Sequence, residues 1–162
     1  MNEAVLRDFF LQRVTAAELA ADMVGTVEQR SRDSVVVHIQ DLPSDEEFTI
    51  TIPMMVRLCD AVLAGDLPGP ALEPIGFAVI ASDHLHWDDD LVGRVLYDWA
   101  SPEINWDLTP ENVRMFRGWL TGELKPPPEP KGSDDLSGAK FVSRTFKAWI
   151  HSPESGRPGD EA

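Results

Sequence analysis

The sequence repeatedly places apolar side chains three or four residues apart, directly behind residues that start helices. Thr15-Ala16-Ala17-Glu18 matches a capping box, in which the threonine hydroxyl and the glutamate carboxylate each satisfy a free backbone N–H. The apolar positions that follow, up to Val24, keep helical spacing and predict one buried face. Thr109 and Pro110 predict another helix start, because threonine caps well and proline suits the first turn. Such a chain is expected to fold mainly as amphipathic helices.

The same spacing predicts further helices along the chain. One short helix is expected to run to about residue 13, and Pro53 opens another whose apolar stripe covers residues 55–63. A further helix is expected over residues 91–99, directly after three consecutive aspartates at residues 88–90. Residues 76–81 are apolar enough either to continue a helix from Leu72 or to form a buried strand, and periodicity alone does not distinguish the two.

Two short strands are predicted between these helices. Residues 34–40 are rich in β-branched side chains, and residues 48–52 alternate apolar side chains with threonine. The link between them is polar and contains Pro43, so an antiparallel hairpin is the simplest connection. The predicted fold class is therefore α+β, a mainly helical single domain with a small antiparallel β-hairpin. A length of 162 residues, 43% of them hydrophobic, fits one folded domain.

The composition changes after Leu124. We expect a globular acidic domain over residues 1–124 and a linker over residues 125–139, which hold four prolines and two glycines. Lys140 to His151 is the only clearly basic stretch, and it mixes aromatic side chains with lysine and arginine. It predicts an amphipathic segment that docks on the acidic body of its own molecule or of a neighbour, or that serves as a free ligand. Residues 152–162 are expected to be disordered.

The stretch from Asp83 to Glu111 carries half of the net charge. It holds eight carboxylates and one basic residue, Arg94, and contributes −7 to a total of −14. Such a field attracts cationic partners and repels polyanions, and the scattered lysines and arginines argue against binding to nucleic acid or to an anionic membrane. The single cysteine, Cys59, lies in an apolar stripe, which predicts a buried thiol, no internal disulfide and a cytoplasmic protein.

Aromatic side chains stand among these acids and predict a binding face. Trp99 and Trp119 fall on or beside apolar stripes and are expected to be buried, whereas Trp87 and Trp106 lie in polar loops and suit an interface. Part of the trio at residues 88–90 is expected to cap a helix, but the acid excess continues beyond it. The predicted partner-binding residues are Asp83, Trp87, Asp88, Asp89, Asp90, Glu103, Trp106 and Asp107.

A second interpretation of this stretch is a metal site. His84 and His86 place two imidazoles on one side of an extended chain, with Asp88 close by. The segment resembles the His-x-His-x-Asp-His signature of metallo-β-lactamase-fold hydrolases, with Asp89 in place of the closing histidine. The resemblance implies a metal-dependent hydrolase that uses His84, His86 and Asp88. The competing interpretation is two surface histidines in a loop before a helix.

The segment from Leu6 to Leu19, LRDFFLQRVTAAEL, resembles the opening of the self-protective colicin-like immunity proteins. These are small acidic bacterial proteins that inactivate toxin nucleases. The resemblance implies a non-enzymatic inhibitor with a basic protein partner, whose carboxylates stand in for phosphates, and it implies no catalytic residues and no cofactor. The alternatives are the metal-dependent hydrolase and a structural subunit or adaptor that inserts Lys140 to His151 into a neighbour.

Overall fold

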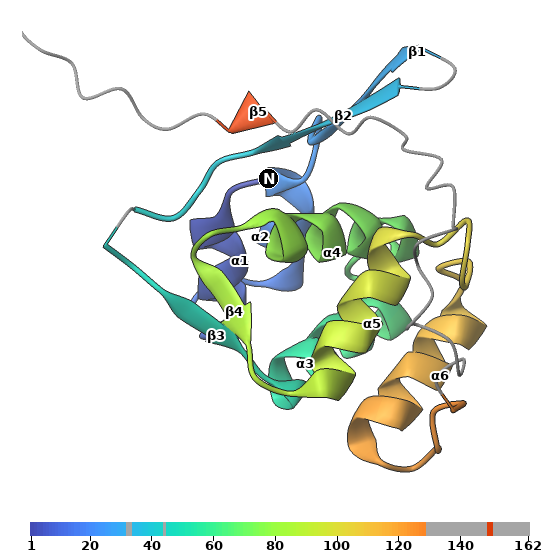
Figure 1. The fold of residues 1–162 in the computed structure, drawn as a ribbon. Coiled ribbons are helices and arrows are strands. Elements are labelled where there is room, and N and C mark those ends of the chain that lie inside the picture. Colours follow the sequence, from blue (N-terminus) through green and yellow to red (C-terminus); the bar gives the residue numbers. More distant parts are fainter. Residues whose placement is uncertain (32–33, 44, 129–148, 151–162) are drawn as a thin grey trace, which may run out of the picture.

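Helices dominate the part of the chain that this computed structural model describes, residues 1–31, 34–43, 45–128 and 149–150. The chain is a mainly helical α+β domain (Figure 1). No helix in these ranges is long and apolar enough to cross a membrane. The helices are α1 (Glu3–Phe10), α2 (Ala16–Asp22), α3 (Ile52–Ala64), the 3-10 helix η1 (Gly69–Ala71), α4 (Leu72–Ala81), α5 (Asp90–Ala100) and α6 (Pro110–Thr121). The strands are β1 (Val27–Ser31), β2 (Ser34–Ile39), β3 (Phe48–Ile50), β4 (Leu85–Trp87) and β5 (Trp149–Ile150).

Two predicted helix starts lie where the local sequence signals place them, whereas α1 ends at Phe10, before its predicted end near residue 13. The hydroxyl of Thr15 accepts the N–H of Glu18, and the Glu18 carboxylate accepts the N–H of Thr15, so the predicted capping box is confirmed. Thr109 caps α6 by accepting the N–H of Asn112. Helix α3 ends at Gly65, whose φ of 82° lies in the left-handed region that favours glycine. Each of these ends depends on contacts within a few residues of the chain.

The core forms where the long helices pack in pairs, α4 against α5 and α3 against α6 (Figure 1). Trp99 of α5 is fully buried and meets the ring of Phe116 edge-on, with the ring centroids 6.2 Å apart. Phe116 in turn meets Trp119 edge-on at 5.3 Å. The predicted burial of Trp99 and Trp119 is therefore confirmed, and these rings tie α5 to α6.

Residues 76–81 belong to a helix, which resolves the choice that periodicity leaves open. Helix α4 is apolar around most of its circumference because it is covered on several sides, so no stripe marks it as helical. At Gly76 the helix approaches α5 closely. A Cβ atom there would lie 2.9 Å from the carbonyl oxygen of Leu96 and 3.1 Å from the Cβ of Trp99. Glycine permits this approach, since any larger residue would push the helices apart.

The antiparallel hairpin exists, but the predicted strand partners were wrong. Strand β2 pairs with β1, in a register that sets Val27 against Val37, and not with β3. Strand β3 instead pairs in parallel with β4, with Phe48 opposite Leu85. Sequence reasoning missed β1 because all five of its residues are exposed and it therefore lacks apolar alternation. It missed the parallel pair because that pairing depends on how α3 and α4 return the chain.

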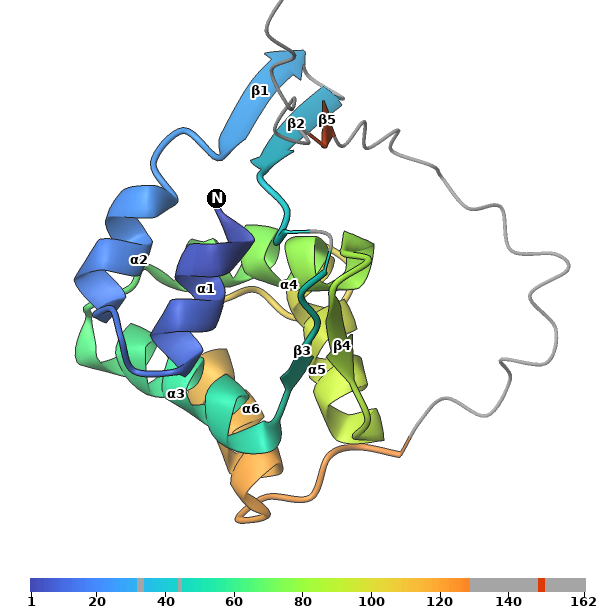
Figure 2. The same cartoon turned by 90° about the vertical axis from the view of Figure 1, so that its left-hand side faces the viewer.

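The first residues of the chain join the hairpin to the helical body. The α-amino group of Met1 donates to the Thr26 hydroxyl at 2.6 Å and to the His38 carbonyl at 2.8 Å. The carboxylate of Glu3 is fully buried and accepts the N–H of Leu42 at 2.8 Å. Burial raises the pKa of Glu3 above its usual value. Figure 2 shows β1 and β2 projecting from the helical body beside this junction.

One part of the predicted docking segment, Trp149–Ile150, forms β5 and pairs in parallel with His38 and Ile39 of β2. This pairing lies within one chain and uses the edge of β2 that β1 leaves open. The rest of that segment, the linker beyond Pro128 and the predicted disordered tail lie outside the described residues. The adaptor interpretation, with insertion into a neighbour, stays a prediction.

The contact at Gly76 predicts an unusual response to alanine. Gly76→Ala should lower the free energy of unfolding by about 1 to 2 kcal/mol, because the clash with α5 outweighs the gain of about 1 kcal/mol in helix propensity. Urea unfolding of the two proteins measures the difference. An increase in stability, as expected for this change at an exposed helical position, would contradict the close approach of α4 and α5.

Candidate functional site

The three consecutive aspartates Asp88, Asp89 and Asp90 stand at the start of helix α5, and each has a different role. The carboxylate of Asp89 accepts the N–H of Leu91 at 2.8 Å and that of Val92 at 3.4 Å, so Asp89 is the N-cap. Asp90 is the first residue of the helix, where its charge favours the helix dipole. Asp88 is exposed and lies before the cap. The capping interpretation is thus confirmed for Asp89, which leaves Asp90 available for other contacts.

The two faces of α5 have opposite character. One face buries Val92, Val95, Leu96 and Trp99. The other face carries Asp90, Arg94, Tyr97 and Asp98, which recur at the spacing that places side chains on one side of a helix. Because the apolar face packs on α4 and α6, these polar and aromatic side chains point outward as a group.

The outer face of α5 forms the floor of an open surface groove of about 750 Å³. The end of β4, the loop after α5 and the chain after α6 supply the walls. The groove is lined by Trp87, Asp90, Gly93, Arg94, Tyr97, Asp98, Asn105, Trp106, Pro127 and Pro128. The lining therefore combines neighbouring residues of the 87–106 region with Pro127 and Pro128, which are distant from it in sequence.

Packing holds the aromatic side chains of the groove in place. The indole of Trp87 lies directly over Gly93, where a Cβ atom would overlap its ring, and it meets Tyr97 edge-on at a centroid distance of 6.4 Å. On another wall, Trp106 meets the buried Trp119 edge-on at 6.2 Å. Tyr97 is 57% exposed and Trp106 is 37% exposed. These rings are oriented before any ligand arrives, which lowers the entropy lost on binding.

The groove contains two acidic side chains, Asp90 and Asp98, and one basic side chain, Arg94. Burial raises the pKa of Asp98 above its usual value, although Arg94 acts in the opposite direction. The Arg94 guanidinium lies 5.4 Å from the ring centroid of Trp119 and donates to the Pro127 carbonyl at 2.7 Å. Among the described residues, neither Asp90 nor Asp98 forms an ion pair. The groove therefore presents two carboxylates that a cationic group can neutralise.

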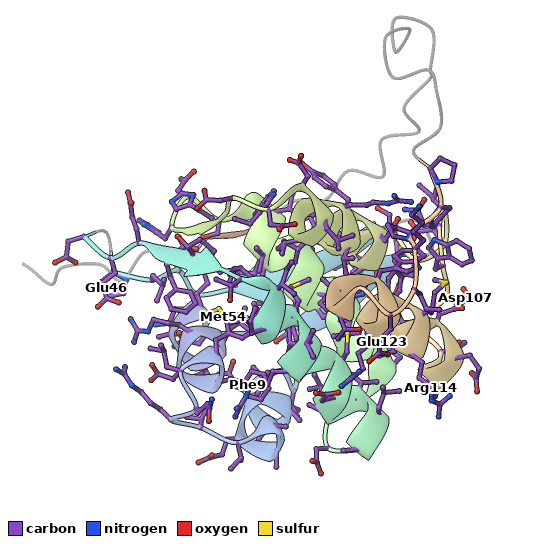
Figure 3. All side chains as sticks on the ribbon, turned by 90° about the horizontal axis from the view of Figure 1, so that it is seen from below. Phe9, Glu46, Met54, Asp107, Arg114 and Glu123 are labelled. Carbon is purple, nitrogen blue, oxygen red and sulfur yellow. The ribbon has the colours of Figure 1, made fainter. Side chains whose placement is uncertain are left out.

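Only some of the predicted binding residues meet at this site. Trp87, Asp90 and Trp106 line the groove together. The predicted residues that are not part of its lining are Asp83, Asp88, Asp89, Glu103 and Asp107. Asp107 directly follows the lining residue Trp106, and Figure 3 shows it at the end of the molecule opposite Glu46.

Sequence reasoning missed the other members of the lining. Tyr97 and Asp98 carried a usable signal, because they continue the face of α5 that Asp90 and Arg94 begin. Asn105 carried no comparable signal, and the prolines after α6 were assigned to a linker. Their place in the groove follows from the path of the chain around α5.

The structure does not support the metal site. Within the described residues no group of three or more histidine, cysteine, aspartate or glutamate side chains lies close enough to hold a metal ion, so His84, His86 and Asp88 do not form one. His86 is exposed and His84 is half-buried, on either side of the buried Leu85.

Burial raises the pKa of the Cys59 thiol to about 12, which disfavours a role of Cys59 as nucleophile.

No protein-family model matches the chain, and no curated protein or solved structure matches it either. Its function is therefore inferred from the chemistry of the groove. The resemblance of residues 6–19 to immunity proteins stays a prediction.

The contact between Trp87 and Gly93 gives a direct test of the groove. Gly93→Ala should displace the Trp87 indole while the helix persists, since alanine favours helix formation. We expect the indole N–H signal of Trp87, assigned with Trp87→Phe, to move in a two-dimensional NMR spectrum. The signal of the buried Trp99 is the internal control and should stay in place. An unmoved Trp87 signal would contradict the packing of the indole on Gly93.

Proposed function

We propose that this chain is a non-enzymatic protein-binding module, of the immunity or inhibitor type, that neutralises a basic partner. The observation that carries the proposal is the groove, in which Trp87, Tyr97 and Trp106 lie beside Asp90 and Asp98. Tryptophan, tyrosine and arginine dominate the binding energy of protein interfaces, and aromatic faces attract lysine and arginine side chains. A groove with both features suits the cationic surface of another protein.

The environment of Asp98 supports a cationic ligand. Its carboxylate is half-buried and its pKa is raised by that burial, so it has already lost part of its hydration. A cationic group that enters the groove interacts with it across a lower dielectric than at an open surface. The folded protein thus bears part of the desolvation cost before the partner binds.

The charge of the whole chain supports the same kind of partner. A net charge of −14 steers cationic proteins toward the surface and speeds their encounter at low salt.

Cytoplasmic residence belongs to the proposal as well, and it is supported by a single cysteine that is buried and free.

Neutral variants of the groove carboxylates test this proposal. Affinity capture from the native source should retain a basic protein on the wild-type chain and release it with salt. Asp90→Asn with Asp98→Asn should slow association with that protein roughly tenfold, because the charges nearest the aromatic side chains are removed. The matched control, Glu47→Gln with Asp66→Asn, makes the same change in net charge at exposed sites outside the groove lining. Equal rates for the two double variants would contradict binding at the groove.

The pH dependence of binding gives a second test. The raised pKa of Asp98 means that this carboxylate takes up a proton at a higher pH than an ordinary aspartate, whose pKa is about 3.9. Affinity for the basic partner should therefore fall as the pH is lowered from 7 toward the range in which ordinary carboxylates take up protons, because lysine and arginine keep their charge there. Asp98→Asn should flatten this part of the profile. Calorimetric titrations at several pH values measure it, and identical profiles would contradict a role for Asp98.

A further inference from the structure

The chain's own prolines already form part of the groove. Pro127 and Pro128 belong to its lining, and the Arg94 guanidinium donates to the Pro127 carbonyl at 2.7 Å. This hydrogen bond joins residues 33 positions apart in the sequence. It anchors the chain that leaves α6 against the outer face of α5. A proline-rich segment thus lies along one wall of the groove, where Pro127 and Pro128 keep exposed surface.

The sequence of this segment favours a polyproline II conformation. Pro126, Pro127 and Pro128 are consecutive, and each proline holds its own φ near −65° and keeps the preceding residue extended. A polyproline II helix makes no hydrogen bonds within itself, so its carbonyl groups need donors from outside. Arg94 supplies one donor here. Proline rings also pack well on the faces of aromatic side chains.

The rest of the groove offers the same chemistry to more of such a peptide. Tyr97 and Trp106 expose aromatic surface, and Asn105 and the Tyr97 hydroxyl are further hydrogen-bond groups on the lining. Asp90 and Asp98 supply negative charge beside them. Grooves that recognise proline-rich segments combine aromatic surface, donors for carbonyl groups and acids for a flanking basic residue.

We propose that the groove recognises proline-rich segments flanked by lysine or arginine, and that Pro127 and Pro128 of this chain occupy part of it within the molecule. The proposal rests on the proposed function and narrows the partner to a protein that presents such a segment. The chain's own sequence has this character, since the prolines lie between Lys125 and Lys131. The flanking cation of a partner pairs with Asp90 or Asp98, and its prolines replace Pro127 and Pro128.

The internal segment acts as a competitor. A segment tethered by a few residues is present at an effective concentration on the order of millimolar, so a partner must displace it in order to bind. The affinity of the wild-type chain for a free peptide is therefore lower than that of a groove without the internal segment. Replacing Pro127 and Pro128 should raise the affinity for the peptide.

A peptide titration of the full chain tests both parts of the proposal. The probe is a nine-residue synthetic peptide with three central prolines and a lysine on each side, and tryptophan fluorescence reports its binding. A matched peptide has alanine in place of the prolines and keeps the charge. We expect the proline peptide to bind at least tenfold more tightly, and Tyr97→Ala with Trp106→Ala to abolish the difference. Far-ultraviolet circular dichroism checks that this variant is folded.

The internal competitor is tested with variants of the full chain. Pro127→Ala with Pro128→Ala should bind the proline peptide several-fold more tightly than the wild-type chain, whereas Pro43→Ala with Pro68→Ala, at exposed prolines outside the groove, should not. Equal affinity of the wild-type chain and the first variant would overturn the assignment of Pro127 and Pro128 as internal occupants. A larger sedimentation mass for the wild-type chain would overturn the intramolecular contact in favour of one between copies.

The outcomes also separate this inference from the proposed function. If both peptides bind equally and salt weakens both, recognition of proline is wrong while the binding of cationic partners stands. If neither peptide binds, recognition of proline-rich segments is wrong, and the capture experiment with the groove variants decides the proposed function independently.

Discussion

The packing of α5 against α4 and α6 is the constraint on which the rest of the molecule depends. Gly76 lets α4 approach α5 closely, and Trp99 of α5 meets Phe116 of α6. These contacts set the rotation of α5 about its axis. Because side chains at helical spacing share one face, that rotation also determines which residues point outward. The groove is the direct consequence, since its floor is the face of α5 that the core leaves free.

The groove shows how a small domain accommodates features that do not favour its own stability. Asp98 is half-buried with a raised pKa, and Tyr97 leaves most of its surface exposed to solvent. Neither feature stabilises the fold, and such departures from local consistency are expected at functional sites. Arg94 is the exception, because it lies over the Trp119 ring and holds the Pro127 carbonyl. One basic residue thus links the core, the groove and the chain that follows α6.

The accuracy of the sequence-based predictions follows the range of the interactions involved. The capping box at Thr15 and the cap at Thr109 depend on neighbours within four residues, and both were predicted. The burial of Trp99 and Trp119 follows from apolar periodicity. Strand pairing was predicted wrongly, because β1 is exposed throughout and β3 finds its partner beyond two helices.

The sequence by itself determined most of the helices, the capped starts of α2 and α6, the fold class and the acidic, aromatic character of the surface around α5. It named Trp87, Asp90 and Trp106 as candidates without showing that they meet. Only the tertiary structure decided that Asp89 is used as a cap, that His84, His86 and Asp88 do not come together as metal ligands among the described residues, and that prolines from beyond α6 line the groove. The reason is physical: local hydrogen bonds and periodicity are written in neighbouring residues, whereas a groove depends on helix packing, which joins residues far apart in the chain.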